Sequence, residues 1–99
     1  MVRSLGVPWS DERWAREIAL LRGSLVEPRL AAVHIPDARE RPDDFVGVKQ
    51  LWLVTSTVEN AHLVVFDREI GRFGLAAAAA QKIETVGIWG DLVSTFCAR

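Results

Sequence analysis

Two histidines, His34 and His62, are the residues best suited to acid–base or metal chemistry in this 99-residue chain. His34 and Asp37 form an H-x-x-D spacing that could begin a metal site, but a metal ion needs three or four ligands. His62 has Glu59 and Asp67 near it in sequence, and a carboxylate–imidazole pair can act as a general base. His62 and Asp67 have opposite parity on one expected strand, so they should face opposite ways. We therefore expect no metal site, and we expect His34 to be a core or edge histidine with an ordinary hydrogen-bond partner.

The nucleophiles and glycines give no stronger signal. Cys97 lies near the end of an apolar segment, where it is expected to act as a small hydrophobic side chain. Ser94 and Thr95 are not flanked by a nucleophile elbow. The glycines at 71, 74, 87 and 90 match no phosphate-binding loop and are explained by turns and bulges. We expect no catalytic residue and no cofactor, which favours a protein that is not an enzyme.

The candidates for contact with a partner are one tryptophan and one charged loop. Trp89 stands between Gly87 and Gly90, and a partly exposed aromatic in such a segment can anchor a partner surface. The alternative is that Trp89 caps the core. Residues 37–44 are dense in charge, and such loops contact partners through bidentate arginine pairs or are simply solvated. The partner-binding candidates are Trp89, Arg39, Arg41, Asp43 and Asp44.

Composition describes one small globular unit. A chain of 99 residues with 49% hydrophobic and 25% charged residues forms a single α+β domain, residues 1–99, with one core. The net charge of −1 argues against a nucleic-acid partner. No segment has the apolar length of a membrane helix or of a signal peptide, and the lone cysteine cannot form an internal disulfide. We expect a cytoplasmic protein with no membrane partner, and the abundance of arginine and alanine suggests a bacterial source.

The centre of the chain predicts a β-meander. Residues 49–57 and 61–67 are rich in β-branched and aromatic residues, which favours two strands. Because the first of these strands is apolar on both sides, it should be central and covered on each face. Asp67 to Gly71 has the turn chemistry of a hairpin loop, and residues 72–76 should form the returning strand.

The flanking segments predict helices and leave two regions open. Ser10 can cap a helix that runs to Arg22 and ends at Gly23, with Trp9 and Trp14 forming a hydrophobic staple. Its apolar stripe should cover the meander. Residues 25–35 fit a short helix or a buried strand, with strand favoured, and residues 75–88 fit either a helix or strands. Residues 36–44 should be a surface loop, and Asp91 should cap a helix over residues 92–98.

The expected fold is therefore α+β, with an N-terminal helix packed on a three- to five-stranded, mainly antiparallel meander and a short C-terminal helix. This order resembles small bacterial immunity and adaptor modules, a likeness of fold that carries no site. We expect a non-catalytic protein-interaction module that self-associates as a homodimer, because a second copy would cover a sheet face that the chain leaves open. The alternative is a small-molecule-binding protein or enzyme with a pocket between helix and sheet, lined by His62, His34 or Arg39 and Arg41.

Overall fold

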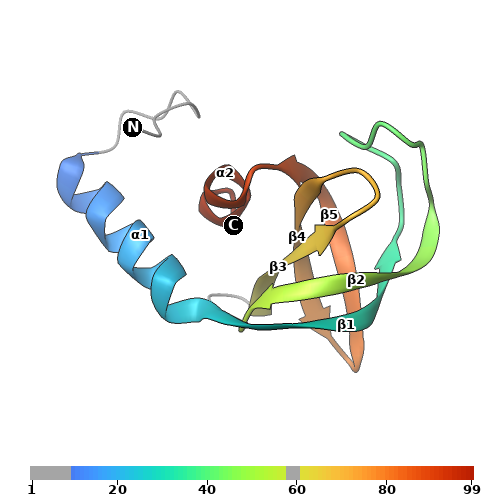
Figure 1. Ribbon diagram of the computed structural model, residues 1–99, viewed down its shortest axis with the longest axis horizontal. Helices are drawn as coiled ribbons and strands as arrows, with labels where there is room; N and C mark the ends of the chain where they lie inside the picture. Colours follow the sequence, from blue (N-terminus) through green and yellow to red (C-terminus); the bar gives the residue numbers. More distant parts are fainter. Residues whose placement is uncertain (1–9, 58–60) are drawn as a thin grey trace.

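The computed structural model describes residues 10–57 and 61–99, which form a barrel with a helix at each end of the chain (Figure 1). The elements are α1 (Asp11–Ser24), β1 (Leu25–Ile35), β2 (Gly47–Thr55), β3 (His62–Asp67), β4 (Arg72–Ala79), β5 (Lys82–Gly90) and α2 (Leu92–Cys97). The predicted α+β class is confirmed.

The five strands follow one another around a closed barrel in the order β1-β2-β3-β4-β5. Consecutive strands are antiparallel, and β1 closes the barrel by lying parallel to β5 where His34 pairs with Glu84. The expected open meander is therefore wrong, although the sequential antiparallel order is right. Closure has a physical reason, since a curled sheet buries its apolar inner face within one chain and pairs its edge strands.

Both segments that the sequence left undecided between helix and strand form strands. Residues 25–35 form β1, as favoured, and residues 72–90 form the β4–β5 hairpin. Four of the five consecutive alanines lie in β4, where Ala76 is fully buried inside the barrel and a larger side chain would not fit. Ala80 and Gln81 turn the chain with φ of 49° and 67°.

Local turn and cap predictions are largely confirmed. The Ser10 side chain accepts a hydrogen bond from Arg13 N, and the Asp91 side chain accepts one from Ser94 N. The Asp67–Gly71 hairpin loop forms, with Gly71 at φ 65°. The expected end of the first helix at Gly23 is wrong, because α1 continues to Ser24 and passes directly into β1. Trp9, half of the expected staple, and the expected connection at 59–60 lie outside the described residues.

The apolar side chains form two clusters, one inside the barrel and one outside it. The inner cluster contains Val33, Ile35, Leu51, Leu53, Leu63, Val65, Ala76 and Trp89. The outer cluster contains Leu21, Val64, Leu75 and Phe96, which places α2 against the outer faces of β3 and β4. Strand alternation explains the division, because Leu63 and Val65 point inward while Val64 points outward.

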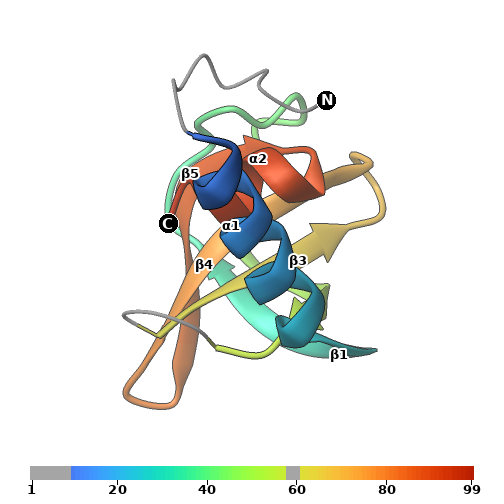
Figure 2. The same cartoon turned by 90° about the vertical axis from the view of Figure 1, so that its left-hand side faces the viewer.

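Helix α1 is set at one end of the molecule (Figures 1 and 2). It packs against α2, and Glu17 pairs with Arg99 at 2.7 Å. Of the predicted apolar stripe, Trp14 and Leu21 are buried but Ile18 is only half-buried. The expectation that α1 lies across the sheet is therefore wrong, because α2 occupies the apolar outer face of β3 and β4.

Candidate functional site

A cluster of charged side chains fills one end of the barrel, where the β1–β2 loop meets the β3–β4 hairpin. We call it the Arg41 cluster, and its members are Arg41, Asp43, Lys49, Asp67 and Glu69. Arg41 donates to both carboxylate oxygens of Asp43 at 2.9 and 2.7 Å, and to Asp67 Oδ2 at 2.8 Å. Lys49 Nζ lies 2.9 Å from Asp67 Oδ2 and 2.6 Å from Glu69 Oε1.

Two predicted partner-binding residues, Arg41 of this cluster and Trp89 beside it, are in contact, but both are buried. The Arg41 side chain is 0% exposed, and its Cζ lies 4.5 Å from the centroid of the Trp89 ring, in cation–π geometry. Trp89 is 5% exposed, so the expectation of a partly exposed tryptophan is wrong and the core-capping alternative holds. The indole packs where Gly74 has no side chain, since a Cβ there would stand 2.6 Å from the ring.

Glu40 also fastens the β1–β2 loop to the barrel, through its side chain and its backbone carbonyl. Trp89 N donates to Glu40 Oε1 at 3.2 Å, and Arg72 Nη1 donates to the Glu40 carbonyl at 3.0 Å. Arg39 is 71% exposed and pairs with Asp37 at 3.2 Å. Thus the predicted surface loop is a loop, but one that seals the barrel end. Of the partner-binding candidates, Arg39, Asp43 and Asp44 are at the surface, and their contact with a partner stays a prediction.

In the Arg41 cluster, the hydrogen bonds between the side chains favour their ionised forms. Hydrogen bonds from Arg41 lower the pKa of Asp43 to about 2. Burial would raise the pKa of Asp67, but hydrogen bonds from Lys49 and Arg41 outweigh it and the net shift is downward. Burial likewise opposes the charge of Arg41, and its bonds to Asp43 and Asp67 outweigh that effect, so its pKa is raised. These three groups are therefore held ionised around neutral pH, which suits a structural clamp and not proton transfer.

A second polar site lies at the seam of the barrel. His34 Nδ1 donates to Glu84 Oε2 at 2.6 Å, and this hydrogen bond lowers the pKa of the Glu84 carboxyl. The pair borders a hollow of about 400 Å³ lined by Ala32, His34, Val48, Gln81, Lys82 and Ile83. None of these lining residues is a serine, threonine or cysteine. The expected hydrogen-bond partner of His34 is thus present, while His62 lies on β3 and does not line this hollow.

A third feature is apolar surface on the first half of the described chain. Six large hydrophobic residues are exposed: Leu20, Leu25, Val26, Leu30, Val46 and Val48. On the outer face of the β1–β2 pair, Leu30 stands opposite Trp52 and His34 opposite Val48, which is 65% exposed. The expectation that both faces of β2 are covered is therefore wrong at Val48, although Val54 on the same face packs against the outer cluster.

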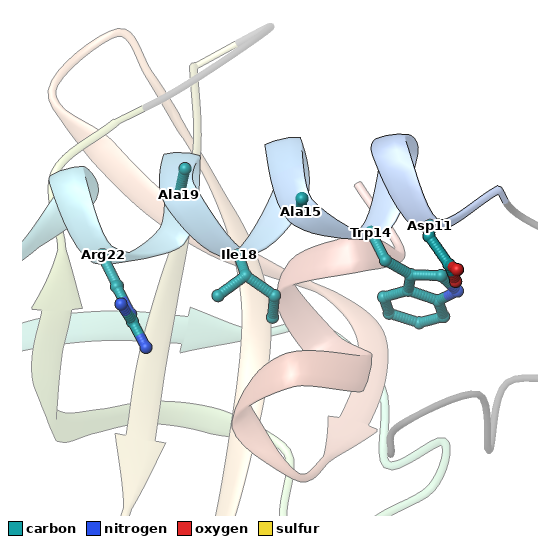
Figure 3. A pocket seen from close by; sticks show the side chains of 6 residues that line it. All are labelled: Asp11, Trp14, Ala15, Ile18, Ala19 and Arg22. Carbon is teal, nitrogen blue, oxygen red and sulfur yellow. The ribbon is translucent and has the colours of Figure 1, made fainter.

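Helix α1 carries a groove of about 550 Å³ (Figure 3). Its lining residues are Asp11, Trp14, Ala15, Ile18, Ala19 and Arg22. In Figure 3 the side chains of Trp14, Ile18 and Arg22 point to the same side of the helix, and the charged residues lie at its two ends.

No family model, curated protein or solved structure matches this chain. Neither helix in the described part has the length and apolar character that crossing a membrane requires. Among residues 10–57 and 61–99, no group of three or more His, Cys, Asp or Glu side chains is arranged to hold a metal ion.

Sequence reasoning missed two sets of residues. The sequence patterns place Lys49 in a strand and Asp67 at a turn, and do not bring the two together. Both residues stand beside long apolar runs, and a lysine or an aspartate that is buried there needs an ion-pair partner. The α1 groove was missed because its small and charged residues do not add to an apolar stripe. Their spacing, with Asp11, Ala15, Ile18 and Arg22 at intervals of four, three and four, was the available signal.

Proposed function

We propose that this chain is a non-catalytic protein-interaction module that associates with a second copy of itself. The observation that carries the proposal is the one-sided distribution of exposed apolar side chains. All six large exposed hydrophobic residues of the described chain lie between positions 20 and 48, on α1, β1, the β1–β2 loop and β2. Leu30 and Val48 lie on the same outer face of the β1–β2 pair, and exposed apolar side chains that gather on one face mark interaction sites.

The outer face of β3 and β4 supports the same proposal by contrast, because this face is covered within the chain. Helix α2 packs on the outer faces of β3 and β4, where its own Phe96 is buried against Val64 and Leu75. The outer face of β1 and β2 has Leu30 and Val48 in solvent instead. A second copy that binds this half of the molecule, α1 with β1 and β2, accounts for the exposed residues, since homo-oligomers reuse one surface on both subunits.

A small-molecule site has less support. That alternative needs two of His34, His62, Arg39 and Arg41 to converge on an enclosed pocket. The hollow at the barrel seam is bordered by His34 without the other three, and Arg41 is packed against Trp89 with its carboxylate partners. The charges near these residues are paired with one another, which favours structural roles over ligand recognition.

Sedimentation equilibrium of the purified chain from low micromolar to near-millimolar concentration tests the proposal. We expect the weight-average mass to rise with concentration from one chain toward two. A mass of one chain over the whole range would overturn self-association. Val48→Lys is a matched probe of the β1–β2 face, because Val48 is exposed and the change should leave folding intact.

A further inference from the structure

The groove face of α1 carries four residues whose spacing is the same from either end of the helix. Asp11, Ala15, Ile18 and Arg22 follow one another at intervals of four, three and four, the spacing that keeps a seam of side chains on one side of a helix. These four residues line the groove, flanked by Trp14 and Ala19 (Figure 3). The face therefore has an acidic end, a basic end and a small-and-apolar centre.

Two copies of this face are complementary when they run antiparallel. A two-fold axis crossing α1 between Arg16 and Glu17 sets Asp11 against the partner's Arg22 and sets Arg22 against the partner's Asp11. The same operation sets Ala15 against the partner's Ile18. Charge meets opposite charge and a small side chain meets a large one at every level. A parallel arrangement would instead place like charges together at both ends.

We propose that α1 docks antiparallel on α1 of a second copy, with Asp11 and Arg22 forming two intermolecular ion pairs. This inference rests on the proposed self-association and names the surface that carries it. Ala15, Ala19 and Arg22 are exposed, so a second helix can reach the face. Alanines at the contact allow two helix axes to approach to about 8 Å, the close end of the usual range.

The size of the face sets the strength of the dimer. The 14 residues of α1 form a rod of about 21 Å, which buries less than a standard interface. We therefore expect a dissociation constant in the micromolar range, weakened by added salt, because exposed ion pairs are screened over roughly 8 Å at physiological ionic strength.

The alternative is that a second copy binds the outer face of β1 and β2. That face is apolar, but its central positions Ala32 and Gln50 offer no charge pattern that is complementary to itself. The charge pattern therefore favours α1 over β1–β2.

Charge reversal tests the pairing by sedimentation equilibrium of the whole chain. Asp11→Arg or Arg22→Asp alone gives two like-charge contacts per dimer, and we expect each to weaken the dimer on the order of tenfold to a hundredfold. An equimolar mixture of the two variants brings opposite charges together at both ends, so it should dimerise as the wild type does. The double variant Asp11→Arg/Arg22→Asp should dimerise again as well.

The double variant also separates pairing from helix stability. Its charges oppose the helix dipole at both ends, so a recovered dimer cannot come from a more stable helix. Arg16→Glu is the matched control, since Arg16 is exposed on α1 but does not line the groove, and it should leave the dimer unchanged. Circular dichroism of each variant verifies that the fold is retained.

Ala15→Glu provides a second route should the charge-reversed helices unfold. Glutamate favours helix, so the substitution should keep α1 intact while placing a charge at the centre of the seam. We expect it to weaken the dimer at least tenfold. A dimer unaffected by Ala15→Glu and by both charge reversals would overturn the α1 pairing while leaving self-association standing, and loss on Val48→Lys would then assign the dimer to β1–β2. A wild-type chain that stays monomeric would overturn both proposals.

Discussion

Replacing Arg41 with methionine should destabilise the fold more than any other single loss of charge in the described chain. Methionine keeps most of the side-chain volume and the contact with Trp89, but it removes the donors to Asp43 and Asp67. The Asp67 side chain is only 2% exposed, so its carboxylate would lose a partner without gaining water. Removing one member of a buried ion pair costs about 3–5 kcal/mol.

The remaining contacts place the expected loss near the lower end of that range. Lys49 stays within 2.9 Å of Asp67 and keeps part of the charge balanced. A loss of about 3 kcal/mol is still large beside the roughly 5–15 kcal/mol by which a domain of this size is stable. With a urea m-value of about 1–3 kcal/mol per molar, the midpoint should fall by roughly 1–3 M.

Urea unfolding at pH 7, followed by tryptophan fluorescence at one low protein concentration, measures the effect without a contribution from association. Arg39→Met is the matched control, because Arg39 belongs to the same loop but pairs with Asp37 in solvent. Its cost should be small beside that of Arg41→Met, because an exposed ion pair contributes little to stability. Adding Asp67→Asn to Arg41→Met should cost less than the sum of the two changes, since the buried charge is then gone. A loss for Arg41→Met as small as that for Arg39→Met would refute the clamp.

Three further predictions concern the barrel end and α2. The hydrogen bonds from Arg41 that lower the pKa of Asp43 to about 2 contribute stability above the unfolded value of about 3.9, so the urea midpoint should fall as pH drops from about 4 to 2. That fall should be smaller in Arg41→Met, and parallel falls in the two proteins would contradict the assignment. Gly74→Ala should lower the unfolding free energy by about 1–3 kcal/mol, because its Cβ would stand 2.6 Å from the Trp89 ring, and an unchanged melting temperature would count against this packing. Asp91→Ala should cost about 0.5–2 kcal/mol through loss of the N-cap of α2, measured by thermal unfolding, and no change would show that the cap bond to Ser94 N is not formed in solution.

The predictions that succeeded depend on interactions between residues that are close in sequence. The strand through Leu51 and Leu53 and the Asp67–Gly71 hairpin follow from propensity and turn chemistry within a few residues. The caps at Ser10 and Asp91 depend on a side chain and an amide three residues apart. Such features need no knowledge of the rest of the fold.

The larger failures depend on residues that are distant in sequence. Barrel closure depends on His34 meeting Glu84, and burial of Trp89 depends on the missing side chain of Gly74. The clamp pairs Arg41 with Asp67, 26 positions later. Periodicity shows that a helix has an apolar side, but it does not say whether a sheet, a second helix or another chain covers that side. The expectation that α1 lies on the sheet failed for this reason.

The sealed barrel end has a practical consequence for anyone engineering this scaffold. A charged, proline-containing connection such as residues 36–46 is where an epitope tag or a grafted peptide would ordinarily be inserted. Here an insertion beside Arg41 would pull its guanidinium out of the interior. The turn at Ala80 and Gln81 is the better graft site, because both residues are exposed and neither side chain is part of the barrel core.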